Sequence, residues 1–313
     1  MAQLVAAFGS SHSPMLASRI EDWQSGFLSR DQARQFVDLD GNACNYAELL
    51  ARAPADAMQR IAPDQLARRH GEAMAAMARL RDDVMSAKLD ALIIVGDDQE
   101  ELFHHDNMPA IGVYYGETIR GRLPYQTEIH EADYPCHAVL ARHLVASLQH
   151  DGFDLSVMRS LAEGKREGHA YSFVHRCYIA EHPVPIVPVF LNAYYPPNQP
   201  SPARCLALGE AIRRAIEVFP QDARVGVMAS GGLSHFVVDE PFDHALIDAL
   251  RRKDAAFFRD APLHKLMSGS SEIRNWICLA GAVGALDMVW SAYAPGYRTP
   301  ALSGTGLCFA SFS

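Results

Sequence analysis

Short apolar segments alternate along the chain with longer segments in which apolar positions recur every three or four residues. The short segments are apolar throughout, which is typical of strands whose two faces are both covered. We expect strands of this kind at residues 4–8, 91–95, 111–115, 184–191 and 225–229.

Two of the longer segments have clear helix starts. One begins at Pro63 and carries an apolar stripe at spacings of three and four residues. The other begins with Ser201 as its N-cap and Pro202 in its first turn. Because strands and helices alternate, the sequence predicts an α/β fold with a mostly parallel central sheet and helices on both faces.

The weakest patterning lies at about residues 19–57. This stretch contains the turn-forming sequence Asp40-Gly41-Asn42 and lacks a clear strand or helix stripe. We therefore expect residues 1–313 to form a single α/β domain, with residues 19–57 as an excursion from it, a candidate lid. This segment is called the excursion below.

Composition narrows the classes of partner. Hydrophobic residues make up 49% of the chain and charged residues 21%, and the formal net charge is −9. Nucleic acids and anionic membranes attract clustered Lys and Arg, so neither is expected as a partner. No apolar run approaches the roughly 20 residues of a membrane span, and the six cysteines form no CxxC pair. We expect a cytoplasmic protein with reduced cysteines.

Polar residues follow three of the expected strands, at residues 9–14, 96–101 and 230–235. The carboxyl ends of parallel strands are the usual place for a functional site. His12 and His235 are the strongest candidates there, because imidazole can bind a metal or exchange a proton near neutral pH. The segment before His235 lacks the Gly-x-Gly-x-x-Gly and Gly-x-Ser-x-Gly patterns of phosphate loops and serine nucleophiles.

Two motifs carry a resemblance to a known family. Ser11-His12-Ser13-Pro14 and Gly231-Gly232-Leu233-Ser234-His235, with residues 184–197 and 204–213, resemble the catalytic subunit of class III (LigB-type) extradiol dioxygenases. The similarity covers residues 2–16 and 88–313. The excursion and Gly96-Asp97-Asp98-Gln99 are most similar to the subgroup that contains 3-O-methylgallate dioxygenase.

The resemblance implies a ring-cleaving enzyme that acts on a catechol- or gallate-like aromatic acid with Fe(II) and O2. It implies that His12 is an iron ligand and that His235 is the acid/base residue. His169 matches another active-site histidine, although the usual Asp-His-Gly of the family is here Gly168-His169-Ala170. The expected substrate-binding residues are Ser11, Gly232 and Ser234.

Two expected iron ligands are absent from their family positions. Gln99 stands where a second histidine is expected, and Pro241 stands where a carboxylate is expected. We therefore expect Glu240 to serve as the carboxylate ligand and Gln99 to be a nonstandard ligand, although an amide oxygen binds iron less well than imidazole. Other residues that offer substitutes are Asp97, Asp98, His104, His105 and His70.

These departures leave three readings open. The first is an Fe(II) dioxygenase. The second is a metal-free hydrolase, lyase or tautomerase that uses His235 and His169 on a related aromatic or diketone acid. The third is a non-catalytic subunit that keeps the pocket. The resemblance also implies a homodimer or a small helical partner subunit, and the sequence does not choose a cation for the substrate carboxylate among Arg159, Lys165 and Arg166.

Overall fold

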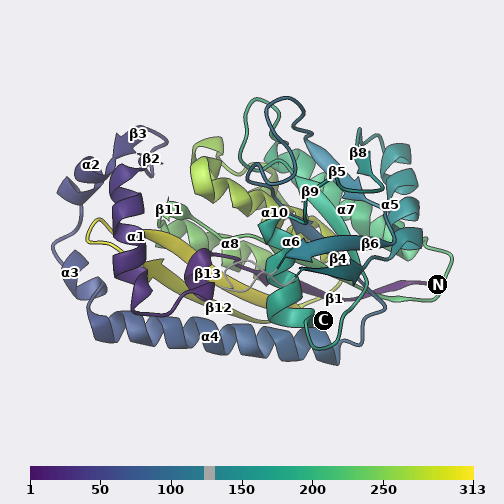
Figure 1. Cartoon of the computed structure of the whole chain (residues 1–313), viewed down its shortest axis with the longest axis horizontal. Coiled ribbons are helices and arrows are strands. Elements are labelled where there is room, and N and C mark those ends of the chain that lie inside the picture. Colours follow the sequence, from purple (N-terminus) through teal and green to yellow (C-terminus); the bar gives the residue numbers. More distant parts are fainter. Residues whose placement is uncertain (123–130) are drawn as a thin grey trace.

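The computed structural model describes residues 1–122 and 131–313, and a large β-sheet runs through its centre (Figure 1). Its strands are β1 (Gln3–Ser10), β4 (Ala91–Gly96), β5 (Ile111–Tyr114), β8 (Ser156–Met158), β9 (Ile186–Leu191), β10 (Arg224–Ser230), β11 (His235–Val237), β12 (Met288–Tyr297) and β13 (Ser303–Phe312). Their order is β11-β13-β1-β10-β4-β9-β5-β8, and β12 pairs with β13. The strands β1, β10, β4 and β9 are parallel neighbours, whereas β13 and β5 join them in antiparallel orientation.

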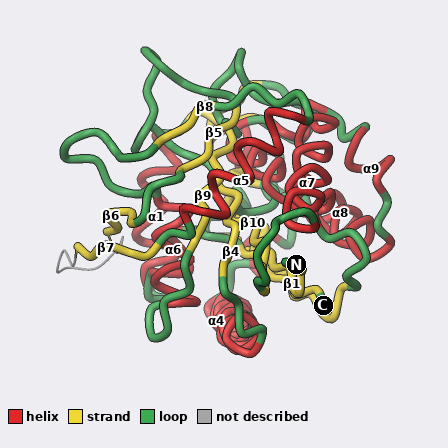
Figure 2. The backbone as a smooth tube through the Cα atoms, turned by 90° about the vertical axis from the view of Figure 1, so that its right-hand side faces the viewer, coloured by secondary structure: helices red, strands yellow, loops and turns green. Residues whose placement is uncertain are grey.

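Helices cover both faces of this sheet (Figure 2). They are α1 (Asp22–Ala33), α2 (Tyr46–Ala51), α3 (Ala57–Arg60), α4 (Pro63–Ser86), α5 (Ala138–His150), α6 (His169–Val174), α7 (Pro202–Glu217), α8 (Glu240–Arg252), α9 (Ala255–Arg259) and α10 (Ile273–Ala282). Shorter helical turns are η1 (Pro14–Ala17), η2 (His175–Ile179), η3 (Leu263–Leu266) and η4 (Ser268–Glu272). Two small hairpins pair β2 (Gln35–Val37) with β3 (Ala43–Asn45) and β6 (Thr118–Arg122) with β7 (Glu131–Pro135).

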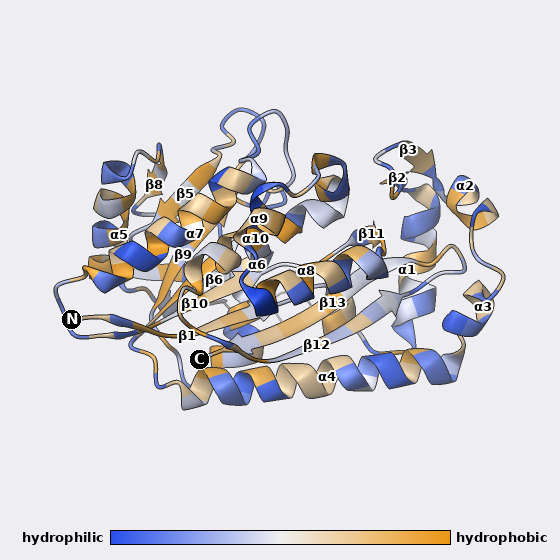
Figure 3. Ribbon diagram, turned by 180° about the vertical axis from the view of Figure 1, so that it is seen from behind, coloured by the Kyte–Doolittle hydropathy of each residue, from blue (hydrophilic) through white to orange (hydrophobic). Residues whose placement is uncertain are grey.

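The buried strands explain why both faces need helices. Successive side chains of a strand point to opposite faces. In β4, Ile93 and Val95 pack with α5, α7 and α10, whereas Leu92 and Ile94 pack with α4 and α6. Figure 3 shows that the central strands are hydrophobic, whereas α4, which has one face in solvent, carries both hydrophobic and hydrophilic residues. The predicted α/β fold with a mostly parallel central sheet is confirmed.

The excursion folds into α1, the β2–β3 hairpin and α2 at one end of the molecule (Figure 1). A buried ion pair attaches it to the sheet, because Arg298 donates to both carboxylate oxygens of Asp31 at 2.8 and 2.9 Å. Ser303 donates to the same carboxylate. Among the helices of the described residues, none has both the length and the apolar character that a membrane span requires.

Candidate active site

The carboxyl ends of three neighbouring parallel strands meet at one cavity. His12 follows β1, Asp97 follows β4 and Gly232 follows β10. This edge of an open α/β sheet is the usual binding edge. The cavity holds about 540 Å³ and is lined by His12, Gln99, His169, Gly232, His235 and Glu272, among others. That volume suits a substrate with a single aromatic ring.

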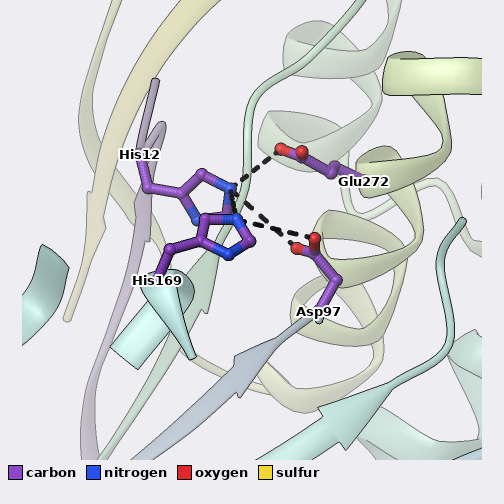
Figure 4. Close-up of side chains that lie close together, drawn as sticks. All are labelled: His12, Asp97, His169 and Glu272. Atoms are coloured by element: carbon purple, nitrogen blue, oxygen red, sulfur yellow. Dashed lines mark hydrogen bonds and ion pairs between the residues drawn. The ribbon is translucent and has the colours of Figure 1, made fainter. Parts of the chain in front are cut away.

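Four side chains converge beside this cavity (Figure 4); three of them line it, and the fourth, Asp97, is fully buried. They are His12, Asp97, His169 at the start of α6, and Glu272 at the end of η4. One potential ligand atom from each lies within 4.8 Å of all the others. The Nε2 atom of His12 is 3.2 Å from Nε2 of His169 and 3.2 Å from Oε2 of Glu272.

Hydrogen bonds at the outer ring atoms orient both histidines. Ser230 donates its hydroxyl proton to the Ala170 carbonyl at 2.7 Å, so it must accept from Nδ1–H of His12 at 3.0 Å. In His169, Nδ1 lies 2.7 Å from the Glu101 carboxylate and donates to it. Neutral imidazole carries one proton, so both Nε2 atoms present lone pairs to the cluster. Histidines that bind metal ions in proteins are typically oriented in this way.

The cluster is negatively charged. Burial raises the pKa of Asp97 to about 6, and the neighbouring Glu272 carboxylate adds to the effect. Burial opposes ionisation of Glu272 as well, but the imidazoles of His235 and His12 hold the pKa of Glu272 well below its usual range. Burial also disfavours the charged form of His169, yet the Glu101 carboxylate raises the pKa of His169 to about 10. The site therefore favours a cation, either a proton or a metal ion.

The Asp97 carboxylate shows the same preference. Asn275 donates to its Oδ1 atom at 3.0 Å, whereas Oδ2 is buried and accepts no hydrogen bond within the described residues. Its nearest charged partner is Nε2 of His169 at 3.8 Å, and a buried carboxylate oxygen is costly to leave without a hydrogen bond. Two imidazole nitrogens and two carboxylates, one with an oxygen that accepts no hydrogen bond within the described residues, form a donor set that fits a divalent transition metal.

His235 stands beside this cluster rather than in it. Its Nδ1 donates to the Leu233 carbonyl at 2.7 Å, and its Nε2 lies 3.1 Å from Oε1 of Glu272 and 3.3 Å from the Tyr194 hydroxyl. Burial lowers the pKa of His235, but the Glu272 carboxylate outweighs it, so the net shift is upward. A Cβ on Gly232 would lie 3.0 Å from the His235 ring, so glycine permits this close approach.

The structure brings most of the predicted site residues together, but not the two serines or Glu240. His12, His169, His235, Gln99 and Gly232 line one cavity. Gln99 directs its amide nitrogen toward Glu272 at 3.4 Å.

The two serines support loops instead. Ser11 is fully buried and accepts from the Cys308 amide at 2.9 Å, while Ser234 donates to the buried Asp243 carboxylate at 2.7 Å. Neither serine lines the cavity within the described residues, so the structure does not support the expectation that they contact a substrate.

Glu240 is not part of the cluster. Pro241 lies in the first turn of α8, and Asp239 caps that helix by accepting from the Phe242 amide. The helix therefore begins at Glu240, whose carboxylate faces Tyr297 and Arg60 and lines a different pocket. The carboxylate that contacts His12 is that of Glu272, a residue that was not predicted from the sequence.

Of the other residues considered as substitute iron ligands, one lies in the cluster and the rest lie elsewhere. Asp97 belongs to the cluster, whereas Asp98 accepts from the amides of Leu102 and Phe103 in the same loop. His104 is exposed and bonded to Lys165. His105 is exposed and paired with Glu100, and His70 packs against Trp23. Within the described residues the cavity lining excludes Arg159, Lys165 and Arg166.

Fold and site together define an α/β protein with a buried histidine–carboxylate centre at the carboxyl edge of a parallel sheet. A family model described as the catalytic LigB subunit of aromatic ring-opening dioxygenase matches residues 64–304. The chain therefore belongs to the LigB family, as its motifs predicted.

Curated relatives share parts of the chain. Gallate dioxygenase of Pseudomonas putida is 38% identical over 107 residues, which cover 33% of this chain and 30% of that protein. The 2,3-dihydroxyphenylpropionate/2,3-dihydroxicinnamic acid 1,2-dioxygenase of Mycolicibacterium paratuberculosis is 30% identical over 161 residues, or 51% of this chain and 48% of that protein. The chain thus matches half or less of the length of each relative.

The fold has a counterpart among solved structures. An uncharacterized protein of Escherichia coli K12 superposes with a TM-score of 0.50 at 15% identity, and the match covers 76% of this chain and 92% of that one. At this identity the likeness concerns the fold alone.

Proposed function

We propose that the protein is an extradiol-type ring-cleaving dioxygenase that uses Fe(II) and O2 on a catechol- or gallate-like aromatic acid. The observation that carries the proposal is the convergence of His12, His169, Glu272 and Asp97 within 4.8 Å beside the cavity. Two imidazoles and one carboxylate are the usual ligands of Fe(II) in non-haem oxygenases. Membership in the LigB family and the activities for which both relatives are named support the same reaction class.

In this proposal His12, His169 and Glu272 hold the iron, and Asp97 is a fourth ligand or a charge beside it. Bound Fe(II) supplies the one-electron chemistry by which O2 reacts with an aromatic ring, and the Lewis acidity that lowers the pKa of a catechol hydroxyl. Ser230 and Glu101 keep the two imidazoles in the tautomer that presents Nε2.

His235 is the acid/base residue of the proposal. Its Nδ1–H is committed to the Leu233 carbonyl, so the neutral ring accepts a proton only at Nε2, which lines the cavity. That nitrogen takes a proton from a substrate hydroxyl and later returns it. Tyr194 donates to Glu272 at 2.7 Å and lies beside His235, so it fixes the position of both side chains.

Matched substitutions at two glutamates test the proposal. The protein is purified and loaded with Fe(II) under anaerobic conditions, and O2 uptake is measured with protocatechuate, gallate and 3-O-methylgallate. We expect the protein to bind iron. We also expect one molecule of ring-opened product for each molecule of O2 consumed, because both oxygen atoms enter the product. Glu272→Gln should lose iron and uptake, whereas the control Glu240→Gln should keep both.

The other outcomes separate the alternatives. Absence of iron binding together with absence of uptake on all three substrates overturns the dioxygenase proposal. Turnover of a diketone acid that depends on His235 but not on metal then supports the acid/base enzyme. Absence of any turnover supports a non-catalytic subunit.

We also propose a cytoplasmic homodimer. The six cysteines are free, as a reducing compartment requires. Light scattering coupled to size-exclusion chromatography tests the dimer, and a monomer that binds a small helical protein would favour the heteromeric form.

A further inference from the structure

Arg34, just after α1 in the excursion, is a cation that forms no ion pair with the residues that the structure describes. Its guanidinium lies over the Phe236 ring, with Cζ 3.6 Å from the ring centroid, and it lines the same cavity as His12 and His235. Its Nε atom is buried and has no hydrogen-bond partner within the described residues. Desolvating a charged donor without a partner is unfavourable, so this position implies a ligand.

The neighbouring carboxylate, that of Asp31, already pairs with another cation. Both oxygens of Asp31 accept from Arg298, and Oδ2 accepts from Ser303 as well. Burial, reinforced by the nearby charge of Arg298, lowers the pKa of Arg34. Asp31 therefore pairs with Arg298, and its attraction for Arg34 is smaller than the repulsion of Arg34 by Arg298.

The other charged residues of the cavity do not compete for this role. Glu101 and Glu272 are paired with histidines. Asp22 is exposed in the first turn of α1, and Arg30 is exposed beside Phe27. Arg34 is thus the guanidinium that combines partial burial, cavity exposure and a free hydrogen-bonding face within the described residues.

The aromatic surroundings define what this cation can bind. Phe236 stacks on the guanidinium and Phe27 lines the same wall. Stacking fixes the plane of the fork, and a fixed fork matches the two oxygens of a carboxylate. His12, His169 and Glu272 line the same cavity, so a ring that spans it would present hydroxyls to these residues and a carboxylate to Arg34.

We propose that Arg34 recognises the carboxylate of the substrate, so that the cavity selects aromatic rings that carry an anionic group opposite their hydroxyls. This inference rests on the proposed function, because it takes the ring hydroxyls to face the His12–Glu272 cluster. It assigns to the excursion a role in specificity rather than in closure alone.

The test compares acids with their esters. Anaerobic calorimetric titration of the Fe(II)-loaded protein measures binding of gallate, protocatechuate and the methyl ester of each. Arg34→Met keeps an apolar stem over Phe236 but removes the charge, Arg34→Lys keeps the charge without the fork, and Arg68→Gln removes an exposed charge on α4 that is paired with Glu72. Thermal unfolding of each variant checks that the fold is intact.

We expect Arg34→Met to weaken acid binding about 10- to 100-fold and to leave ester binding unchanged, the loss typical of a charge-assisted hydrogen bond. Arg34→Lys should recover part of the affinity, and Arg68→Gln should match the wild type. Equal affinity of acid and ester in the wild type, including no binding of either, overturns the inference. Equal weakening of both in Arg34→Met overturns it too, because that marks a structural role.

The readout does not depend on turnover. If acids bind through Arg34 but no ring is cleaved, the carboxylate site stands and the dioxygenase proposal fails. If rings are cleaved and the Arg34 variants treat acids as the wild type does, the dioxygenase proposal stands and this inference fails.

Discussion

The Nε2 atoms of His12 and His169 lie 3.2 Å apart, although 157 residues separate them in the sequence. With Nδ1 of each ring committed to Ser230 or Glu101, the two lone pairs point at each other. When both rings are neutral, two acceptors face each other, and either a proton on His169, whose pKa is raised to about 10, or a metal ion satisfies both. Because Ser230 and Glu101 hold the Nδ1 atoms, they determine how the two Nε2 atoms face each other.

The first prediction concerns those partners. Ser230→Ala and Glu101→Gln should each lower the affinity for Fe(II) about 10- to 100-fold, because residues that orient ligating histidines have effects of this size. Competition with a chelator of known affinity measures the change. Glu100→Gln is the control, since Glu100 pairs with the exposed His105. Unchanged affinity in both variants would remove the two histidines from the proposed ligand set.

A second prediction separates proton transfer from metal binding. His235→Ala should reduce kcat about 100- to 10,000-fold, the usual contribution of an acid/base residue, while iron content stays at the wild-type level. Its Nε2 contacts Glu272 and Tyr194 but is outside the four-residue cluster. Steady-state rates and metal analysis of the same preparations distinguish a role in proton transfer from a role as a metal ligand. Loss of iron in parallel with activity would instead make His235 a ligand.

Local patterns were sufficient to predict the centre of the sheet and the long helices. The continuous apolar segment that became β4 is fully buried, and Ser201 caps α7 by accepting from the Arg204 amide, as its sequence indicated. The strands β12 and β13 were missed. Their segments contain Gly, Pro and Ser, and β13 is buried through pairing with β1, β11 and β12, a tertiary effect that no local pattern contains.

The histidine–carboxylate cluster was harder to predict than the fold. His12 and Asp97 closely follow the ends of predicted strands, and His169 lies in a segment that matches a family motif, so all three could be found from the sequence. Glu272 lies at the end of a short helical turn, where an acidic residue is common without function. Its contact with His12 exists only in the folded chain. Glu240 was predicted as the carboxylate ligand because it precedes Pro241, which occupies the family position. Asp239 caps α8 instead, and the Glu240 side chain contacts Tyr297.

The third prediction concerns the attachment of the excursion. Breaking a buried ion pair by removing one partner typically costs about 3–5 kcal/mol, and both Asp31 and Arg298 are buried. We expect Arg298→Met to lower the free energy of unfolding by this amount, measured by denaturant titration. Arg68→Met, which breaks an exposed pair with Glu72, should cost less than about 1 kcal/mol.

Amide hydrogen exchange in α1 tests the expected lid in the same variants. If Asp31 holds the excursion closed, exchange in α1 should be slow in the wild type and faster in Arg298→Met. Fast exchange in the wild type would show that the excursion opens despite the buried pair.

The fourth prediction follows from Asp243, which accepts hydrogen bonds from Ser234 and Tyr293 behind the loop of His235. Burial outweighs these bonds and raises the pKa of Asp243 from 3.8 to about 7. The folded state therefore binds this proton more tightly than the unfolded state does. The stabilisation is complete below about pH 4 and is lost as the pH rises toward and past 7, by a few kcal/mol in total.

Asp243→Asn removes this titration while it keeps a similar shape. The difference in free energy of unfolding between wild type and Asp243→Asn should therefore fall as the pH rises from about 4 to 8. Urea titrations at several pH values measure it, and subtracting the variant cancels other buried groups such as Asp97. A difference that stays constant over this range would mean that Asp243 is ionised throughout, with its three donors compensating for burial.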